Sequence, residues 1–234
     1  MALGLGLHTA PLITPLSWEP KDGRLNDELI FWLKNNTNVS TGAWLDESDN
    51  NNDATQSVGG RQPSVNEGGL EFDGVADVLN FDNLITINPD SDFSLCIALE
   101  MYSDIENTLL EYDAVNRISL SQNDVISVSG GNPEVVSTTA TTTSGDIYNS
   151  TEKIWIILQR SASGSTLVST NKQLSFNYDP SSFTNGLTIN KLGGVSDGYL
   201  DATILEVFMY NTIFTSGELK KAKDYLKYKF SIYR

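Results

Sequence analysis

Short apolar runs separated by polar, glycine-containing turns fill most of the chain. The clearest runs are Leu29–Leu33, Phe93–Met101, Lys153–Gln159 and Leu200–Tyr210. Apolar runs of this length between turn signals are typical of buried β-strands. The turns recur at short intervals, as in two-sheet sandwiches and unlike folds that alternate strands with helices. The pattern therefore predicts an all-β fold of two antiparallel sheets.

The C-terminal segment alone has the pattern of a helix. Thr215 and Glu218 have the spacing of a capping box, in which each side chain binds the other residue's backbone N–H. An apolar stripe follows at helical spacing, formed by Leu219, Ala222, Leu226 and Phe230. We therefore expect a short C-terminal α-helix over residues 216–230, with the lysines between the apolar positions facing water.

The run Ile154–Leu158 is apolar at every position. In a two-sheet sandwich one face of a strand packs on the other sheet, and the second face commonly meets water. An entirely apolar strand therefore requires a cover on the outer face of its sheet. The C-terminal helix or the N-terminal segment could supply this cover.

Residues 1–25 differ in pattern from the domain expected over residues 26–234. Leucine and glycine alternate at the start, and Pro11, Pro15 and Pro20 follow, which excludes a helix or a central strand. The segment is an extended arm that either packs on its own domain or inserts into a partner subunit. In the second interpretation the anchoring residues are Leu3, Leu5, Leu7, Leu12 and Ile13.

The chain is acidic, with 30 Asp and Glu against 15 Lys and Arg and a formal net charge of −15. Such a charge repels phosphate backbones and anionic lipids, so we expect neither nucleic acid nor a membrane as a partner. Six of the basic residues follow Glu218. This basic tail fits a solvated helix face, or a docking surface for an acidic neighbour such as another copy of the chain.

Residues that could support catalysis are few. Cys96 is the single cysteine, which excludes an intrachain disulfide and a thiolate-rich metal site, and its apolar run predicts a place in the core. His8 is the single histidine, and it lies in the Gly/Leu segment without a Ser or Asp beside it. We therefore expect neither an activated nucleophile nor a zinc site.

The N-terminus lacks the positive region of a signal peptide, and prolines interrupt its apolar stretch. No stretch reaches the length of a membrane span. We therefore expect no secretion signal, which makes the sequons at Asn35, Asn38 and Asn149 incidental.

A dense group of oxygen ligands follows Trp44, and a second acidic turn could approach it. Hard oxygen ligands suit Ca²⁺, although Asn51 and Ser57 replace the Gly and the bidentate Glu of an EF-hand loop. The alternative is that these side chains form local turn bonds to the backbone. No cofactor is required, and the calcium hypothesis uses Asp46, Asp49, Asp53, Asp73 and Asp77, with Ser48 and Asn50 nearby.

Carbohydrate binding commonly uses an exposed aromatic ring beside polar groups. Four aromatic residues adjoin loop-like segments, namely Trp18, Tyr148, Tyr178 and Tyr199. Ordinary packing is the alternative for each of them.

Four segments, in this order, carry a resemblance to a known family: Leu29–Lys34, Trp44–Thr55, Leu70–Asp77 and Gly198–Tyr210. The second is similar to a loop with Trp, Asp-x-Ser-Gly-Asn and Asn-x-Ala-Thr, with Asp49 where the family usually has glycine. The third contains a Phe-Asp-Gly-x-x-Asp turn. Residues 26–234 thus resemble laminin-G-like, concanavalin A-like domains. The resemblance implies a jelly-roll β-sandwich, preceded here by the arm and closed by the helix.

Glycoside hydrolases with this fold carry Glu-x-Asp-x-x-Glu on one strand face. The nearest strings, Glu71–Asp73 and Glu111–Asp113, lack the third acid. Because glycoside hydrolysis needs a pair of placed carboxylates, the chain is not expected to be an enzyme.

The Leu/Gly start of the chain, its acidic domain and the lack of a secretion signal together resemble laminin-G-like virion proteins of tailed bacteriophages. This resemblance implies a non-catalytic capsid decoration or fibre-like component, assembled in the host cytoplasm, located in the virion and anchored through its arm. Its partners would be the major capsid protein or a fibre or neck protein, and further copies of itself, with a trimer as the expected homo-oligomer. The alternative is a carbohydrate-binding adhesin that attaches to host-surface glycans.

Overall fold

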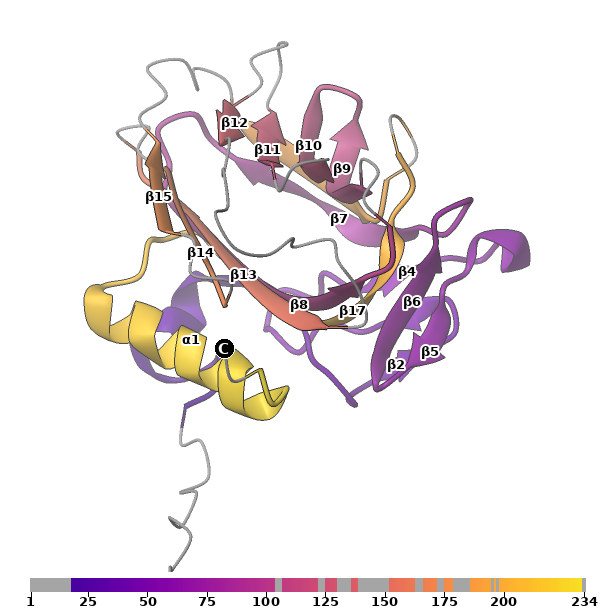
Figure 1. The fold of residues 1–234 in the computed structure, drawn as a ribbon, viewed down its shortest axis with the longest axis horizontal. Coiled ribbons are helices and arrows are strands. Elements are labelled where there is room, and N and C mark those ends of the chain that lie inside the picture. Colours follow the sequence, from indigo (N-terminus) through magenta and orange to yellow (C-terminus); the bar gives the residue numbers. More distant parts are fainter. Residues whose placement is uncertain are drawn as a thin grey trace, which may run out of the picture.

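A computed structural model describes residues 18–103, 107–121, 125–129, 136–138, 152–162, 166–171, 175–178, 186–194, 196 and 198–232. Two antiparallel sheets form a sandwich, and one α-helix lies on the outer face of one sheet (Figure 1). The predicted all-β sandwich with a C-terminal helix is confirmed. The proposed anchoring residues Leu3, Leu5, Leu7, Leu12 and Ile13 lie outside the described residues, as does His8.

The first sheet, within the described residues, has the strand order β15-β14-β13-β8-β17-β6-β5. Strand β1 pairs with β17 beyond the end of β6, with Leu33 opposite Val207. The bounds are β1 (Leu29–Leu33), β5 (Ser64–Asn66), β6 (Gly69–Asp73), β8 (Phe93–Met101), β13 (Lys153–Arg160), β14 (Thr166–Thr170), β15 (Ser175–Tyr178) and β17 (Asp201–Tyr210).

The second sheet, in the same part of the chain, has the order β12-β11-β10-β9-β16-β7-β4-β3-β2. Its bounds are β2 (Val39–Ser40), β3 (Ala43–Trp44), β4 (Ala54–Thr55), β7 (Leu79–Ile87), β9 (Asn107–Asp113), β10 (Asn116–Ser121), β11 (Val125–Ser129), β12 (Val136–Thr138) and β16 (Leu187–Leu192). The helices are the 3₁₀ helices η1 (Gly23–Glu28) and η2 (Gly59–Arg61) and the α-helix α1 (Ser216–Lys229).

The space between the sheets is filled by one apolar cluster. Alternate residues of β13 and β8, such as Ile156 and Ile97, point into it, and Trp44 and Phe72 are fully buried there. Alternation along each strand sends the intervening residues to the outer face of the first sheet. That face is also apolar, as the sequence of β13 indicated.

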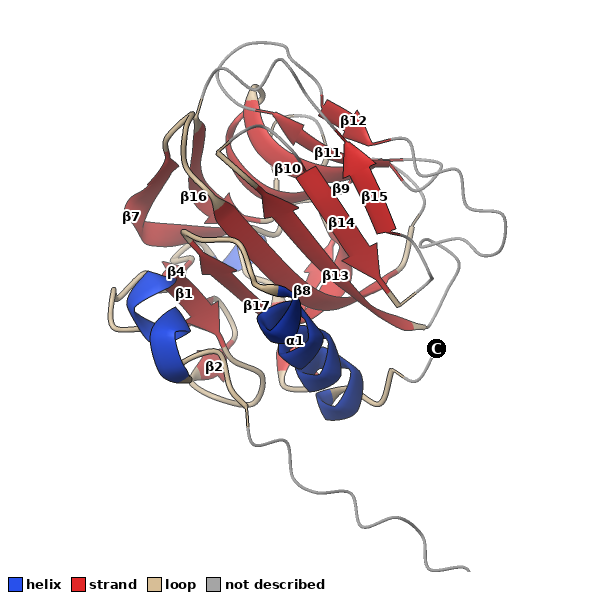
Figure 2. Ribbon diagram, turned by 90° about the vertical axis from the view of Figure 1, so that its left-hand side faces the viewer, coloured by secondary structure: helices blue, strands red, loops and turns tan. Residues whose placement is uncertain are grey.

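A second apolar cluster, here called the outer cluster, covers the outer face of the first sheet. It joins Trp32, Cys96, Trp155, Ile157 and Phe208 of the sheet to Trp18 and Leu25 of the N-terminal segment and to Ala222, Tyr225, Leu226 and Phe230 of the C-terminal segment. Figure 2 shows α1 lying across β17 and β8. The predicted cover on the entirely apolar strand is therefore confirmed, and both helix and N-terminal segment supply it.

The described part of the predicted arm, residues 18–25, packs on its own domain. Trp18 is 7% exposed, and its ring meets the ring of Tyr225 edge-on at 5.5 Å between centroids. The hydroxyl of Tyr210 donates a hydrogen bond to the carbonyl of Pro20 at 2.9 Å. Apolar side chains in this segment gain more from the outer cluster than from solvent, so residues 18–25 pack on the sandwich ahead of its first strand.

The capping box predicted for the helix is present. The Oγ1 of Thr215 accepts a hydrogen bond from the backbone N–H of Glu218, and the Glu218 carboxylate accepts one from the backbone N–H of Thr215 at 2.9 Å. Both bonds satisfy donors that the first turn of a helix leaves without partners. The helix ends at Lys229, and Phe230, which the sequence placed in the helix, is its C-cap.

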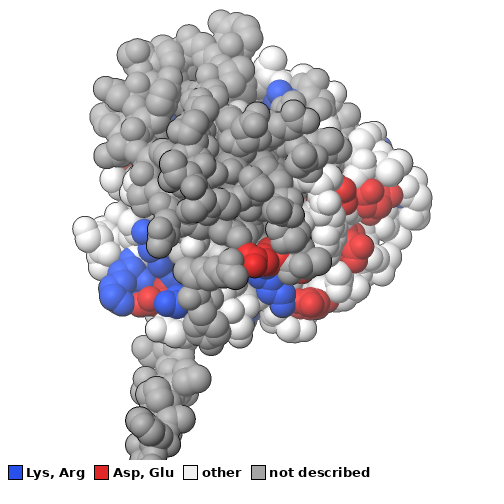
Figure 3. All heavy atoms as spheres, viewed as in Figure 1, with Lys and Arg blue, Asp and Glu red and all other residues white. Residues whose placement is uncertain are grey.

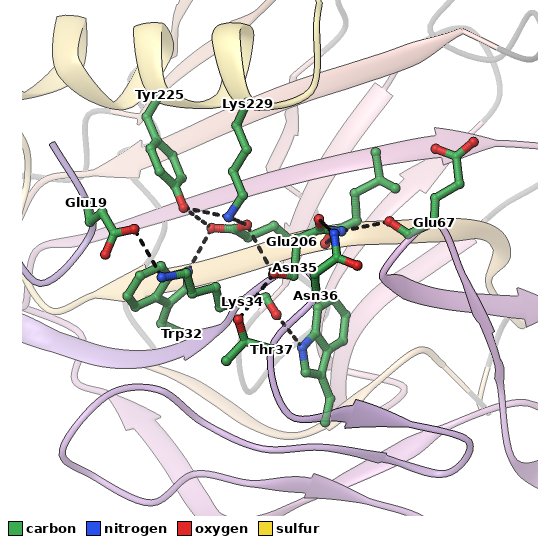
Figure 4. A network of polar contacts seen from close by, with 12 residues as sticks. Glu19, Trp32, Lys34, Asn35, Asn36, Thr37, Glu67, Glu206, Tyr225 and Lys229 are labelled. Atoms are coloured by element: carbon green, nitrogen blue, oxygen red, sulfur yellow. Dashed lines mark hydrogen bonds and ion pairs between the residues drawn. The ribbon is translucent and has the colours of Figure 1, made fainter. Parts of the chain in front are cut away.

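Glu206 is a charged residue in the middle of the apolar strand β17, and it has no exposed surface. Its carboxylate accepts hydrogen bonds from Trp32 Nε1 at 2.8 Å, from the Tyr225 hydroxyl at 2.6 Å and from the Asn35 backbone N–H at 3.2 Å. Lys229 completes the group as an ion-pair partner (Figure 4). We call this group the Glu206 network. It joins β1, β17 and α1 beneath the outer cluster.

The expectation that the helix lysines face water is correct for Lys220 and wrong for Lys229. The Lys220 side chain is 76% exposed and pairs with Asp224, whereas the Lys229 side chain is 22% exposed and reaches Glu206. A buried carboxylate is very costly without a cation, so Lys229 turns inward. Other basic side chains gather on the surface over α1 (Figure 3).

Candidate functional site

The first acidic loop, residues 45–53, uses its carboxylates to bind its own backbone and that of β1. Asp46 accepts hydrogen bonds from the backbone N–H groups of Trp32 at 2.7 Å, Ser48 at 2.8 Å and Asn52 at 2.9 Å. Asp53 accepts one from the N–H of Asp46 at 2.7 Å. These are the local turn bonds that the sequence offered as the alternative to a calcium site.

The second acidic turn is built in the same way. One oxygen of Asp73 accepts the N–H groups of Val75 and Ala76 at 2.9 Å and that of Asp77 at 3.2 Å. Burial acts to raise the pKa of Asp73, but these three N–H groups bring it below its ordinary value. Burial and the nearby Asp73 carboxylate raise the pKa of Asp77. The turn is thus fixed by an ionised Asp73.

The five candidate calcium ligands do not converge. Asp49 is exposed and pairs with Lys21 at 2.9 Å. Among the described residues, no group of three or more His, Cys, Asp or Glu side chains could hold a metal ion. The positions of these carboxylates do not favour a calcium site. Calcium binding therefore stays a prediction.

The structure describes the side chains of two of the four aromatic candidates for sugar binding, Trp18 and Tyr199. Trp18 is buried in the outer cluster, so the prediction of an exposed ring is wrong for this residue, because α1 covers it. Tyr199 is half-buried between β16 and β17. Tyr178 is the last residue of β15, and Tyr148 lies outside the described residues.

The acids of the Glu111–Asp113 string serve the fold. Glu111 has no exposed surface; its carboxylate accepts hydrogen bonds from Lys191 Nζ at 3.1 Å and from Ser196 Oγ at 2.8 Å. Asp113 accepts the N–H of Asn116 at 2.9 Å in the turn between β9 and β10. Because both carboxylates already bind neighbouring groups of the fold, their arrangement fits a structural role and not that of a catalytic acid–base pair.

An open pocket of about 510 Å³ lies where β1 of the first sheet faces β7 of the second. Figure 2 shows these two strands on the same side of the molecule. The lining residues come from η1, β1, the loop after β3, β7 and the turn after β17, namely Asp27, Glu28, Leu29, Ile30, Asn50, Asn52, Asn83, Leu84, Ile85, Thr86, Ile87 and Asn211. We call this the edge pocket.

Backbone contacts fix the asparagines of the edge pocket. Asn50 Nδ2 donates to the carbonyls of Leu29 and Ile30, and Asn52 Nδ2 donates to the carbonyl of Ile30 at 2.8 Å. Asn83 Nδ2 donates to the carbonyl of Asn51 at 3.1 Å, which ties β7 to the same loop. With their N–H groups engaged in this way, the amides retain oxygen acceptors for a ligand.

The edge pocket also has an apolar part. Leu84 is 57% exposed in the middle of β7, where the strand breaks its alternation of buried and exposed residues. Half-buried Ile30 lies across the pocket lining on β1. Within the described residues the pocket therefore combines two carboxylates, several amides and an aliphatic patch, without an aromatic or a basic side chain.

Sequence reasoning missed most of this pocket. Its residues come from four segments far apart in the chain, so no local spacing connects them. The Asn-rich loop was noticed, but as a group of metal ligands. The one available signal was the polar interruption Asp82-Asn83 before Leu84 in the strand β7, which a regular alternating strand would not contain.

No helix within the described residues has the length and apolar character needed to cross a membrane.

Neither family models nor the sequences of curated proteins match this chain. Solved structures do match in fold. The binding domain of botulinum neurotoxin DC, in complex with rat synaptotagmin II, has a TM-score of 0.59 at 12% identity, over 87% of this chain and 52% of that chain. Botulinum neurotoxin type C, whose cell entry depends upon interaction with two ganglioside molecules, has 0.54 at 15% identity, over 89% and 52%. Trypanosoma rangeli sialidase in complex with sialic acid has 0.56 at 15% identity, over 88% and 34%.

The chain therefore spans from about a third to about half of the length of these proteins. At such identities the likeness shows the fold alone. The β-sandwich, jelly-roll-like architecture implied by the family resemblance is thereby supported, and the bacteriophage context stays a prediction.

Proposed function

We propose that this chain is a non-catalytic carbohydrate-binding domain and that the edge pocket is its ligand site. The observation that carries the proposal is the lining of the pocket, which places carboxylate and amide oxygens around an exposed aliphatic side chain. Structures of similar fold include proteins described with sialic acid or gangliosides, which is consistent with a binding role for such a sandwich.

The chemistry of a sugar matches this lining. Each hydroxyl is both a hydrogen-bond donor and an acceptor, so the carboxylates of Asp27 and Glu28 and the oxygen of Asn211 can accept from it. The C–H face of a pyranose is apolar and can pack on Leu84 in place of an aromatic ring. The pocket volume of about 510 Å³ is in the range of small-ligand sites.

Changing Leu84 to serine or Asn211 to alanine should weaken binding to the best ligand of a glycan array about tenfold. The first change removes the aliphatic contact, and the second removes an oxygen acceptor, each worth roughly 1–2 kcal/mol. The Asn211 backbone N–H donates a hydrogen bond to the backbone carbonyl of Glu28, and the Asn211→Ala variant keeps this bond. Isothermal titration calorimetry with the array ligand gives the affinities.

The matched control is Val75→Ser, which removes an apolar side chain that is 67% exposed and does not line the edge pocket. This variant should bind like the unchanged protein. Absence of any glycan above background, or equal affinities for all three variants, would contradict the proposal.

A second proposed function is that of a structural virion component, a capsid decoration or fibre-like protein anchored through its N-terminal arm. The observation that favours it is the apolar, Gly- and Pro-rich sequence before Trp18, a residue that is itself fixed against α1. The helix that fixes Trp18 carries basic side chains on its surface (Figure 3). An anchor of this kind becomes effective when many copies bind one lattice.

Deleting residues 1–17 should leave the melting temperature within about 3 °C of that of the full chain, because the described residues of the outer cluster, from Trp18 on, already cover the sheet. The same deletion should abolish copurification with virions. A deletion of residues 1–20 is the informative comparison, since it also removes Trp18 and the carbonyl that binds Tyr210 and should destabilise the domain. Normal incorporation of the 1–17 deletion would refute the anchoring role.

A further inference from the structure

The edge pocket carries negative charge that no basic lining residue balances. Asp27 and Glu28 belong to η1 and both line it. Within the described residues the lining contains no Lys, Arg or His. Among the lining residues, the formal charge is therefore carried by these two carboxylates alone.

Two cations of the same N-terminal segment lie outside the lining and are paired with other carboxylates. Arg24, also on η1, bonds Glu218 of α1 through its guanidinium at 2.6 Å and interacts electrostatically with Glu28. Lys21 pairs with Asp49 at 2.9 Å. An acidic ligand in the pocket would have to compete with these protein carboxylates for both cations.

The chain as a whole is also negatively charged, with a formal net charge of −15. Salt at physiological strength screens charges beyond about 8 Å, so distant carboxylates contribute little. The two lining carboxylates act at short range, where a like charge costs about a factor of ten in affinity even at high effective dielectric constant. Local charge is thus the main determinant of which ligand the pocket accepts.

We infer that the edge pocket binds uncharged sugar units and rejects glycans that end in sialic acid. The inference rests on the proposed carbohydrate-binding function and specifies its ligand class. A neutral hexose offers hydroxyl donors to Asp27 and Glu28, whereas the carboxylate of a sialic acid can only accept and carries the same charge. The edge pocket would thus reject the ligand that the sialidase of similar fold holds, which is sialic acid.

The test uses the full chain and a panel of oligosaccharides that end in glucose, galactose, mannose or N-acetylhexosamine. Each is compared with the same oligosaccharide capped with sialic acid and capped with the sialic acid methyl ester, which has nearly the same size without the charge. Affinities are measured at 20 mM and 500 mM NaCl. Neutral glycans should bind at least tenfold more tightly than their sialic acid forms, and the methyl ester should bind distinctly better than the acid.

Two double variants separate local from overall charge. Asp27→Asn with Glu28→Gln removes both pocket carboxylates and should reduce the difference between neutral and sialylated glycans to less than threefold. Glu67→Gln with Asp224→Asn removes the same total charge from the turn between β5 and β6 and from α1, which do not line the pocket. This control should retain the full difference.

The outcomes distinguish the inference from the function on which it rests. Sialylated glycans that bind as well as neutral ones, with binding lost in the Leu84→Ser variant, would overturn the inference and leave the proposed function standing. Equal rejection of the acid and the methyl ester would overturn the electrostatic basis of selectivity. No binding by any member of the panel would overturn both.

Discussion

Replacing Glu206 with alanine is expected to lower the free energy of unfolding by about 3–5 kcal/mol. The substitution leaves the indole N–H of Trp32, the hydroxyl of Tyr225 and the backbone N–H of Asn35 without their acceptor at a fully buried position. It also leaves the Lys229 ammonium without its counter-ion. A buried donor without a partner costs more than the hydrogen bond itself contributed, which makes the loss large.

Urea unfolding followed by circular dichroism measures this loss. Glu206→Gln should give an intermediate value, because the amide oxygen can still accept hydrogen bonds but its NH₂ group faces donors. Glu19→Gln is the control: it removes an exposed ion pair with Lys34 at 3.0 Å and should cost less than about 1 kcal/mol. A loss below about 1 kcal/mol for Glu206→Ala would show that the Glu206 network does not stabilise the fold.

Replacing Leu226 with aspartate should detach α1 from the sheet and cost about 4 kcal/mol or more. Leu226 has no exposed surface and packs in the outer cluster. The variant loses the burial of a leucine and places a carboxylate in the apolar outer cluster. Detachment would expose Trp32, Trp155 and Phe208, since the helix covers the sheet at these residues.

Two measurements check this expectation. The variant should bind a hydrophobic dye that the unchanged protein does not bind, and size-exclusion chromatography should show self-association through the uncovered face. Lys221→Asp places the same side chain on the exposed face of the same helix and should behave like the unchanged protein. A Leu226→Asp variant that stays monomeric and does not bind dye would contradict the assignment of α1 as a required layer.

The parts of the fold that depend on local pattern were predictable from the sequence. The apolar runs placed β1, β8, β13 and β17, and the Thr215–Glu218 spacing placed the start of α1. The apolar character of β13 on both faces even predicted a cover on the outer face. These features were accessible because strand periodicity and helix capping are properties of neighbouring residues.

Other features required contacts between distant residues. Trp18 was a candidate for an exposed sugar-binding ring because it adjoins a loop-like segment, with ordinary packing as the alternative, and Tyr225 packs on its ring from the other end of the chain. Glu206 interrupts an apolar strand, and its partner Lys229 could not be identified from spacing alone. The edge pocket was invisible for the same reason, since its residues meet only after β1 and β7 are placed.

The pairing of β1 with β17 has a consequence for the order of folding during synthesis. Trp32 and Glu206, which this pairing brings together, are 174 positions apart, and α1 follows β17 in the chain. The ribosome must therefore release almost the entire described sequence before the first sheet gains its last central strand and its cover. Until then the apolar strands β8 and β13 have no protection on their outer face. Closure by contacts of such long range is slow and leaves the nascent chain prone to aggregation, so this domain is a natural client for chaperones during translation.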